Sequence, residues 1–251
     1  MMLFDAHCHL EDGSFDPDRD EVLARAKEAG VIRIVTSPLS SDDTLKALSY
    51  FRRSDLVSIS IGLDVSEYCD EEVERTFELI ITNSDEIVAV GEVGLDYRVA
   101  STGGPSKERQ KEVFRRFIRL AEELDKPLVV HSLWAQRPTL NLLDEEGATR
   151  VILHAFGGKL SDVEFAVARG WFISIPTNVI RSSNVRSVAE ITPLDNMVLE
   201  SDSPVLAPDP NERNEPANLI HSANFLAKLK GVSPEDIAEI TTSNAKRVYC
   251  V

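Results

Sequence analysis

Cysteine is scarce in this sequence, and the few cysteines present have no regular spacing. The 251 residues include three, Cys8, Cys69 and Cys250, and no two of them form a CxxC pair. Disulfide-stabilised secreted domains usually carry dense, even-numbered cysteines at short intervals. The pattern therefore fits a reducing compartment better than a disulfide framework, so we expect a cytoplasmic protein.

Long hydrophobic runs are also missing. The longest apolar runs, such as 127–130 and 151–153, have the length of a strand and are far too short to cross a bilayer. The amino terminus lacks a positively charged segment followed by an apolar stretch, so no secretory signal is expected. These absences indicate a water-soluble protein.

Basic residues are outnumbered, with 27 Lys and Arg against 42 Asp and Glu and a formal net charge of -15. Extended, sequence-independent binding of duplex DNA needs clustered cations, so this class of protein is disfavoured. A nuclease that holds one or two nucleotides at a chain end is not excluded, since bound divalent ions reverse the local field. Acidic helix faces that maintain solubility are the simplest explanation of the charge.

Short β-branched segments alternate with longer amphipathic ones along the whole chain. The predicted strands cover residues 3–7, 32–37, 57–63, 87–93, 128–131, 151–154, 172–175 and 197–200. Eight strand–helix units in a chain of this length predict a single (β/α)8 TIM barrel spanning residues 1–251. An open doubly wound sheet is the alternative. Its dinucleotide-binding form is disfavoured because residues 5–9, rather than a glycine-rich phosphate loop, follow the first strand.

Local signals support the predicted helices. Residues 112–124 have apolar side chains at helical spacing, with Arg or Glu on the other face. Asp16 before Pro17, and Ser233 before Pro234, are typical of helix starts. Gly30 and Gly147 stand where helices should end, and residues 100–106 read as a loop.

Histidine is rare as well, yet four of the five histidines fall where predicted strands end. In the first strand, alternate residues share one face, so Asp5, His7 and His9 point the same way. The remaining polar residues at strand ends are Glu92, His131, His154 and Asp202. These residues all belong to the carboxyl-terminal rim, where barrel enzymes place their chemistry. A lone histidine is usually structural, and His221, on an amphipathic segment, is interpreted that way or as exposed.

Four imidazoles and two carboxylates exceed the ligands of one tetrahedral ion with an open position, and they divide naturally between two divalent ions. We expect His7, His9 and Asp202 to hold the first ion, His131 and His154 the second, and Glu92 to bridge them. Zn, Mn, Co, Ni, Fe and Mg remain candidates. The surplus positive charge would ionise water and attract an anionic substrate.

With these residues in place, the sequence resembles the TatD family of metal-dependent deoxyribonucleases, among the amidohydrolase-like barrels. The resemblance is carried by segments spread over the chain, at 4–10, 91–97, 130–132, 153–156, 200–204, 213–216 and 244–245. It implies a two-metal barrel that hydrolyses phosphodiester bonds, with DNA ends as the macromolecular partner. The chain departs from the family pattern at Asp64–Val65, where a histidine and proline are usual, and at Leu133, where an arginine is usual.

Further roles follow for residues near the rim. Asp202 is the candidate general base, and Arg213, in the loop 208–216, is either a phosphate ligand or a surface arginine. Asp5 and Glu200 are expected one layer beneath the ions, where they would orient the histidine ligands. Asp96 is a candidate loop anchor.

Two aromatic residues also fall near the mouth of the predicted barrel. Tyr97 and Trp134 could stack on a nucleobase, although packing within the rim is the other reading. Because a fold and its metals do not fix the substrate, hydrolysis of an amide, lactone or other carboxyl derivative stays open beside phosphodiester hydrolysis. A non-enzymatic scaffold is disfavoured by the complete ligand set.

Overall fold

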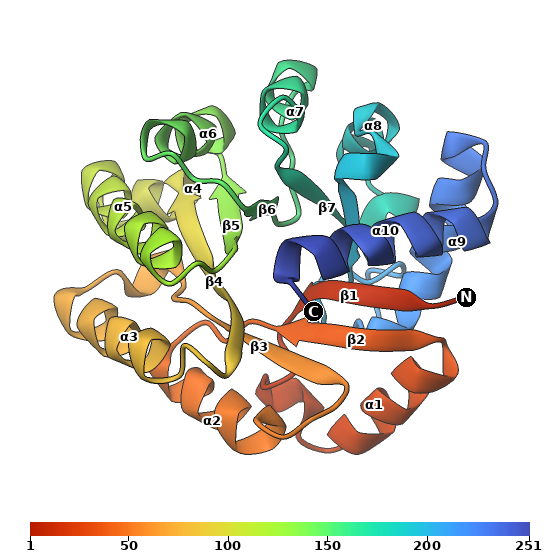
Figure 1. Ribbon diagram of the computed structural model, residues 1–251, viewed down its shortest axis with the longest axis horizontal. Helices are drawn as coiled ribbons and strands as arrows, with labels where there is room; N and C mark the ends of the chain where they lie inside the picture. Colours follow the sequence, from red (N-terminus) through yellow and green to blue (C-terminus); the bar gives the residue numbers. More distant parts are fainter.

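Eight parallel strands lie side by side in chain order, from β1 to β8, in the computed structural model, which describes residues 1–251. Helices surround the strands, as Figure 1 shows. The strands are β1 Leu3–Cys8, β2 Val31–Thr36, β3 Val57–Ile61, β4 Ile87–Asp96, β5 Leu128–Leu133, β6 Val151–Leu153, β7 Phe172–Pro176 and β8 Met197–Glu200. The predicted (β/α)8 TIM barrel is therefore confirmed.

The first and last strands meet through the segment that follows β8. The Asp202 amide donates to the His7 carbonyl at 3.0 Å, and the His9 amide donates to the Ser203 carbonyl at 2.8 Å. These bonds close the ring at the carboxyl-terminal ends of the strands. Closure therefore brings Asp202 directly beside His7 of β1 and His9, which follows this strand.

Helices connect successive strands and cover the outside of the barrel (Figure 1). The α-helices are α1 Arg19–Glu28, α2 Ser41–Phe51, α3 Asp70–Thr82, α4 Tyr97–Ser101, α5 Lys107–Glu123, α6 Gln136–Glu145, α7 Leu160–Val167, α8 Ser183–Ile191, α9 Leu219–Lys230 and α10 Pro234–Tyr249. The 3-10 helices are η1 Gly13–Phe15, η2 Val65–Glu67, η3 Thr177–Ile180, η4 Leu194–Asn196 and η5 Pro216–Asn218. None of the helices combines the length and the apolarity needed to cross a lipid bilayer.

The strand boundaries match the predicted ones to within two residues, except that β4 continues three residues past its predicted end, to Asp96, so that Glu92 lies inside the strand; the exceptions among the helix signals have local causes. Ser233 caps α10 in a capping box with Asp236, as its spacing indicated. The start signal at Asp16 is wrong: α1 begins at Arg19, and the Asp16 carboxylate instead accepts a hydrogen bond from the Arg19 guanidinium at 2.6 Å. The predicted loop 100–106 is shorter, because Asp96 caps α4, which continues to Ser101.

The alternation of β1 decides what faces the barrel interior. Phe4 stacks on Tyr249 of α10, with ring centroids 5.8 Å apart, and the Tyr249 hydroxyl donates to the Ala6 carbonyl at 2.6 Å. Helix α10 thus lies along the outer face of β1 (Figure 1). Asp5 and His7, which have the opposite parity, are fully buried on the interior side.

Candidate metal centre

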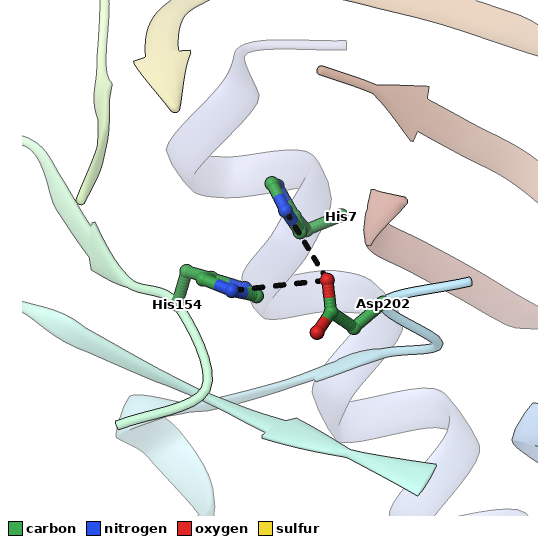
Figure 2. A group of neighbouring side chains, drawn as sticks. All are labelled: His7, His154 and Asp202. Atoms are coloured by element: carbon green, nitrogen blue, oxygen red, sulfur yellow. Dashed lines mark ion pairs between the residues drawn. The ribbon is translucent and has the colours of Figure 1, made fainter. Parts of the chain in front are cut away.

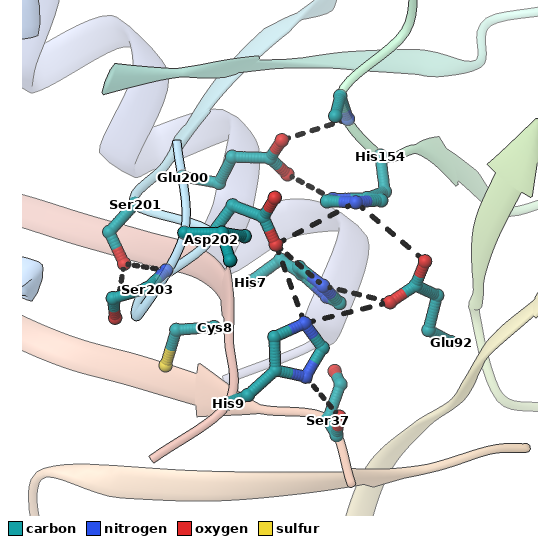
Figure 3. Close-up of polar contacts among 12 residues, drawn as sticks. His7, Cys8, His9, Ser37, Glu92, His154, Glu200, Ser201, Asp202 and Ser203 are labelled. Atoms are coloured by element: carbon teal, nitrogen blue, oxygen red, sulfur yellow. Dashed lines mark hydrogen bonds and ion pairs between the residues drawn. The ribbon is translucent and has the colours of Figure 1, made fainter. Parts of the chain in front are cut away.

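The six predicted ligands converge at the carboxyl-terminal rim of the strands (Figure 3 shows five of them). His7, Glu92 and His131 lie within β1, β4 and β5, whereas the other three follow the ends of β1, β6 and β8. Three overlapping triads have all their ligand atoms within 4.8 Å of one another: His7 with His154 and Asp202, His7 with His9 and Glu92, and Glu92 with His131 and His154. Folding therefore assembles one contiguous cluster from residues spread over the chain.

Glu92 lies between two pairs of histidines. Its Oε2 atom is 3.2 Å from His7 Nε2 and 3.8 Å from His9 Nε2. Its Oε1 atom is 2.7 Å from His131 Nδ1 and 3.7 Å from His154 Nε2. Each carboxylate oxygen thus faces its own imidazole pair, the arrangement expected of a residue that bridges two cations.

Asp202 approaches the cluster from the opposite side. Its Oδ1 atom lies 3.4 Å from His9 Nε2, 3.6 Å from His7 Nε2 and 3.8 Å from His154 Nε2. Figure 2 shows this oxygen directed at the His7 and His154 rings. Asp202 itself adopts a left-handed backbone conformation with φ 54°, which aspartate tolerates better than most residues.

Hydrogen bonds behind the cluster fix the orientation of two rings. His9 Nδ1 donates to the Ser37 carbonyl at 2.7 Å, and because a carbonyl can only accept, the lone pair of His9 is left on Nε2. His154 Nδ1 lies 3.0 Å from Oε2 of Glu200, a fully buried carboxylate that also accepts from the Ala155 amide. In the neutral form of each ring, the lone pair would therefore be on the Nε2 atom that faces the ligand carboxylates, as second-layer hydrogen bonds to metal-binding histidines require.

Asp5 has a different partner from the one expected. Its carboxylate accepts from the Ser201 amide at 2.7 Å and lies 2.6 Å from the Ser201 hydroxyl, and it touches no histidine ring. Burial raises the pKa of Asp5 to about 8. Asp5 thus supports the turn that carries Asp202, whereas Glu200 has the histidine contact that was predicted for both.

The charges in the cluster compensate one another. Burial opposes ionisation of Glu92, but the rings of His154, His131 and His7 outweigh it and hold the pKa of Glu92 well below its usual range. Burial likewise opposes the charged form of His9, yet Asp202 and Glu92 raise the pKa of His9 to about 9. Two buried carboxylates therefore demand nearby positive charge, which either protons or bound cations can provide.

His7 shows that cations suit this cluster better than protons alone. Burial lowers the pKa of His7, and neither of its fully buried ring nitrogens has a hydrogen-bond partner. Burying a polar atom without a hydrogen-bond partner costs free energy. Here one such atom, Nε2 of His7, is directed at the carboxylates of Glu92 and Asp202. The donor set of imidazole nitrogens and carboxylate oxygens fits divalent transition metals.

The remaining predicted site residues are placed as follows. The Arg213 guanidinium pairs with Asp18 at 2.7 Å and lies over the Phe15 ring, so it is engaged by the η1–α1 region rather than by the cluster. Asp96 anchors its loop as expected, by accepting from the Arg98 and Val99 amides. Its Oδ2 also lies 3.5 Å from His131 Nε2, a contact that the sequence did not indicate. His221 is exposed on α9.

Asn214 is a supporting residue whose role sequence reasoning missed. Its buried side-chain amide donates to the Ser201 carbonyl at 2.6 Å, the Val205 carbonyl at 2.8 Å and the Thr177 hydroxyl at 2.8 Å. These bonds tie the loop after β8 to the residue before Asp202. Its position inside the motif 213–216 was the only available signal.

Replacing Asn214 with alanine is expected to lower the free energy of unfolding by about 1–3 kcal/mol, because buried carbonyls lose their donor. Urea denaturation monitored by circular dichroism measures this change. Asn211→Ala, which removes an exposed amide bonded only to Asp209, is the matched control and should stay within about 0.5 kcal/mol. Equal stability of the two variants would remove the supporting role.

Comparison with known proteins agrees with this geometry. Residues 4–250 match the family described as TatD related DNase. The chain is 40% identical over 259 residues to deoxyribonuclease TATDN3 of Homo sapiens, covering 98% of this chain and 94% of the human protein. It is 34% identical over 257 residues to YabD of Bacillus subtilis, an uncharacterized metal-dependent hydrolase, with 99% of each chain covered.

A solved structure shows the same fold. The TatD homologue YJJV of Escherichia coli superposes with a TM-score of 0.91 at 24% identity, covering 99% of this chain and 98% of the other. At that identity the likeness supports the barrel alone, whereas the family match and the two relatives extend over nearly the whole sequence. The chain belongs to the TatD-related DNase family and is a metal-dependent hydrolase.

Proposed function

We propose that this protein hydrolyses phosphodiester bonds at the ends of DNA strands, with two divalent cations held by the rim cluster. The observation that carries the proposal is the position of Glu92, whose two oxygens face separate histidine pairs. Bound there, two cations supply the positive charge that ionises a water molecule and neutralises a phosphate oxygen. His7, His9 and Asp202 would hold the first cation, and His131 and His154 the second.

Asp202 is the residue we assign to proton transfer. Its Oδ1 is directed at three imidazoles, which leaves Oδ2 to accept a proton from the attacking water. The hydrogen bonds that join the Asp202 amide to His7 and the Ser203 carbonyl to His9 hold the backbone that carries this carboxylate at the mouth of the barrel.

The choice of DNA is supported by the human relative, whose name is deoxyribonuclease TATDN3. Asp64, which departs from the family pattern, accepts a hydrogen bond from the Ser66 amide at 2.8 Å and caps η2. The Asp64 carboxylate therefore has a structural role, as the cap of η2, near the mouth of the barrel. The net charge of -15 favours action on a short end over binding of a long duplex.

Parallel assays of the purified, metal-loaded protein test the proposal. A fluorescent single-stranded oligonucleotide should be shortened, while a panel of amides and lactones should not be turned over. Metal analysis should find close to two divalent ions per chain. Turnover of the carboxyl compounds alone would replace the proposed substrate by the amidohydrolase alternative, and a protein that stays metal-free and inert after addition of Mn, Co, Zn or Mg would contradict an enzymatic role altogether.

A further inference from the structure

We propose that Trp134 is a stacking platform for an unpaired nucleobase next to the cleaved bond. The inference rests on the proposed function and adds a substrate-binding residue to it. Trp134 follows β5 directly, three residues after His131, and this residue is 64% exposed. It is the most exposed aromatic residue of the chain.

Two hollows meet at this side chain. One, of about 510 Å³, is lined by Tyr97, Ala100, Ser101, Ser106, Lys107 and Trp134. The other, of about 430 Å³, lies between Trp134 and the loop after β6, where Gly157 and Gly158 contribute to its lining. Trp134 thus lines both hollows, and each hollow is large enough for part of a nucleotide.

The two hollows are lined by residues that follow β4, β5 and β6, the strands that carry or directly precede Glu92, His131 and His154. Tyr97 directly follows Asp96, which lies 3.5 Å from His131 Nε2. Asp96 is paired with Leu133, so Tyr97 and Trp134 leave adjacent strands at matching positions. Gly157 follows His154 by three residues. A nucleotide seated beside Trp134 would therefore lie on the same rim of the barrel as the proposed second cation.

The stability of the fold does not explain why a tryptophan stands at position 134. Its backbone is held at φ 54°, a left-handed conformation that costs a bulky residue free energy, and its ring gains little from burial. The Tyr97 ring already carries the Lys107 ammonium at 4.6 Å, and neither a ring nor a cation stacks on Trp134. An open indole face at the mouth of a nuclease is the kind of surface on which bases stack.

The charge of the two hollows suits a nucleotide. Lys107 lines the first and Arg137 and Lys159 line the second, whereas Asp162, which pairs with Arg137, is the only acidic lining residue. This excess of cations occurs in a chain whose net charge is -15. Phosphates flanking a stacked base would thus meet positive side chains, while an uncharged apolar ligand would gain nothing from them.

Kinetics with matched oligonucleotides test the platform. The substrates are a short single-stranded DNA and two versions with an abasic residue at either end. For the unmodified protein, one abasic version should show a KM higher by about 5- to 100-fold. Trp134→Ala should raise the KM of the complete oligonucleotide by a similar factor, leave kcat within about twofold, and abolish the difference between complete and abasic substrates.

Two further variants separate stacking from a structural effect. Trp134→Phe keeps a ring and should restore most of the lost affinity. Tyr50→Ala removes an exposed aromatic side chain from α2, away from the hollows, and should leave the KM unchanged. Trp134→Ala that retains the preference for the complete oligonucleotide would overturn the inference, even if DNA is cleaved.

Fluorescence gives a readout that does not depend on turnover. The chain has two tryptophans, and Trp171 is buried with its indole N–H bonded to the Ala148 carbonyl. Quenching by a phosphorothioate oligonucleotide, absent with its terminal abasic form, should therefore report on Trp134. Failure to cleave any DNA while quenching persists would contradict the proposed function alone, whereas cleavage without quenching would contradict the platform alone.

Discussion

Asp202→Asn is expected to lower kcat by about 10²–10⁴-fold, the effect of losing a general base. Asparagine has nearly the same shape, so the backbone bond from residue 202 to the His7 carbonyl and the turn held by Asp5 should persist. The amide, however, cannot accept the proton of the attacking water. Steady-state hydrolysis of the fluorescent oligonucleotide, with circular dichroism to confirm folding, measures the change.

Because Asp202 is also a proposed cation ligand, metal content must be measured on the same sample. A large drop in kcat with most of the metal retained supports proton transfer, whereas parallel loss of both supports a purely ligating role. Asp64→Asn is the matched control, since it neutralises another carboxylate near the mouth that only caps η2. Its kcat should stay within a few-fold of the unmodified protein. Near-normal turnover by Asp202→Asn would remove the assigned role.

The barrel and its ligands could be predicted because they depend on local patterns. Strand parity placed Asp5, His7 and His9 on one face, and the parallel arrangement then required the residues at the other strand ends to meet them. The structure brings all six together as expected. These inferences need only the period of a strand and the rule that parallel strands end at one rim.

Supporting contacts could not be predicted in the same way, because they join residues that are distant in the sequence. Ser37 lies 28 residues from His9, and Ser201 lies 196 residues from Asp5. Such pairings depend on how each β–α loop folds over the rim, which no periodicity encodes. The role first expected of Asp5 was therefore only half right: it has the predicted depth, but it holds the turn before Asp202 instead of an imidazole.

The helix start predicted at Asp16 failed for a related physical reason. Asp16 and Asp18 both precede the charged first turn of α1, and either can satisfy a helix start by composition. In the structure, Asp16 pairs with the Arg19 guanidinium, while Asp18 pairs with Arg25 and Arg213. A local ion pair of Asp16 and a tertiary ion pair of Asp18 with Arg213 thus decide between two equivalent local signals. The same pairs explain why Arg213, a plausible phosphate ligand by sequence, is engaged elsewhere.

The second large effect is expected for Glu92→Gln, which tests the division of the cluster into two cation sites. Glutamine preserves the volume between the histidine pairs but removes the negative charge and one acceptor oxygen. Hydrolysis should fall by about 10³-fold or more, since charge stabilisation worth several kcal/mol is lost. Metal analysis should find fewer ions bound at both positions, because each oxygen of Glu92 faces a different pair.

His131→Ala provides the comparison that makes this result specific. The ion pairs of His131 are with Glu92 Oε1 and Asp96, and none joins it to His7, His9 or Asp202. Its loss should therefore release about one cation per chain and leave the group formed by His7, His9 and Asp202 intact. A Glu92→Gln variant that loses one ion, like His131→Ala, would mean that Glu92 serves a single position. A variant that keeps both ions would mean that the carboxylate bridges nothing, because imidazoles and Asp202 would then hold the cations unaided.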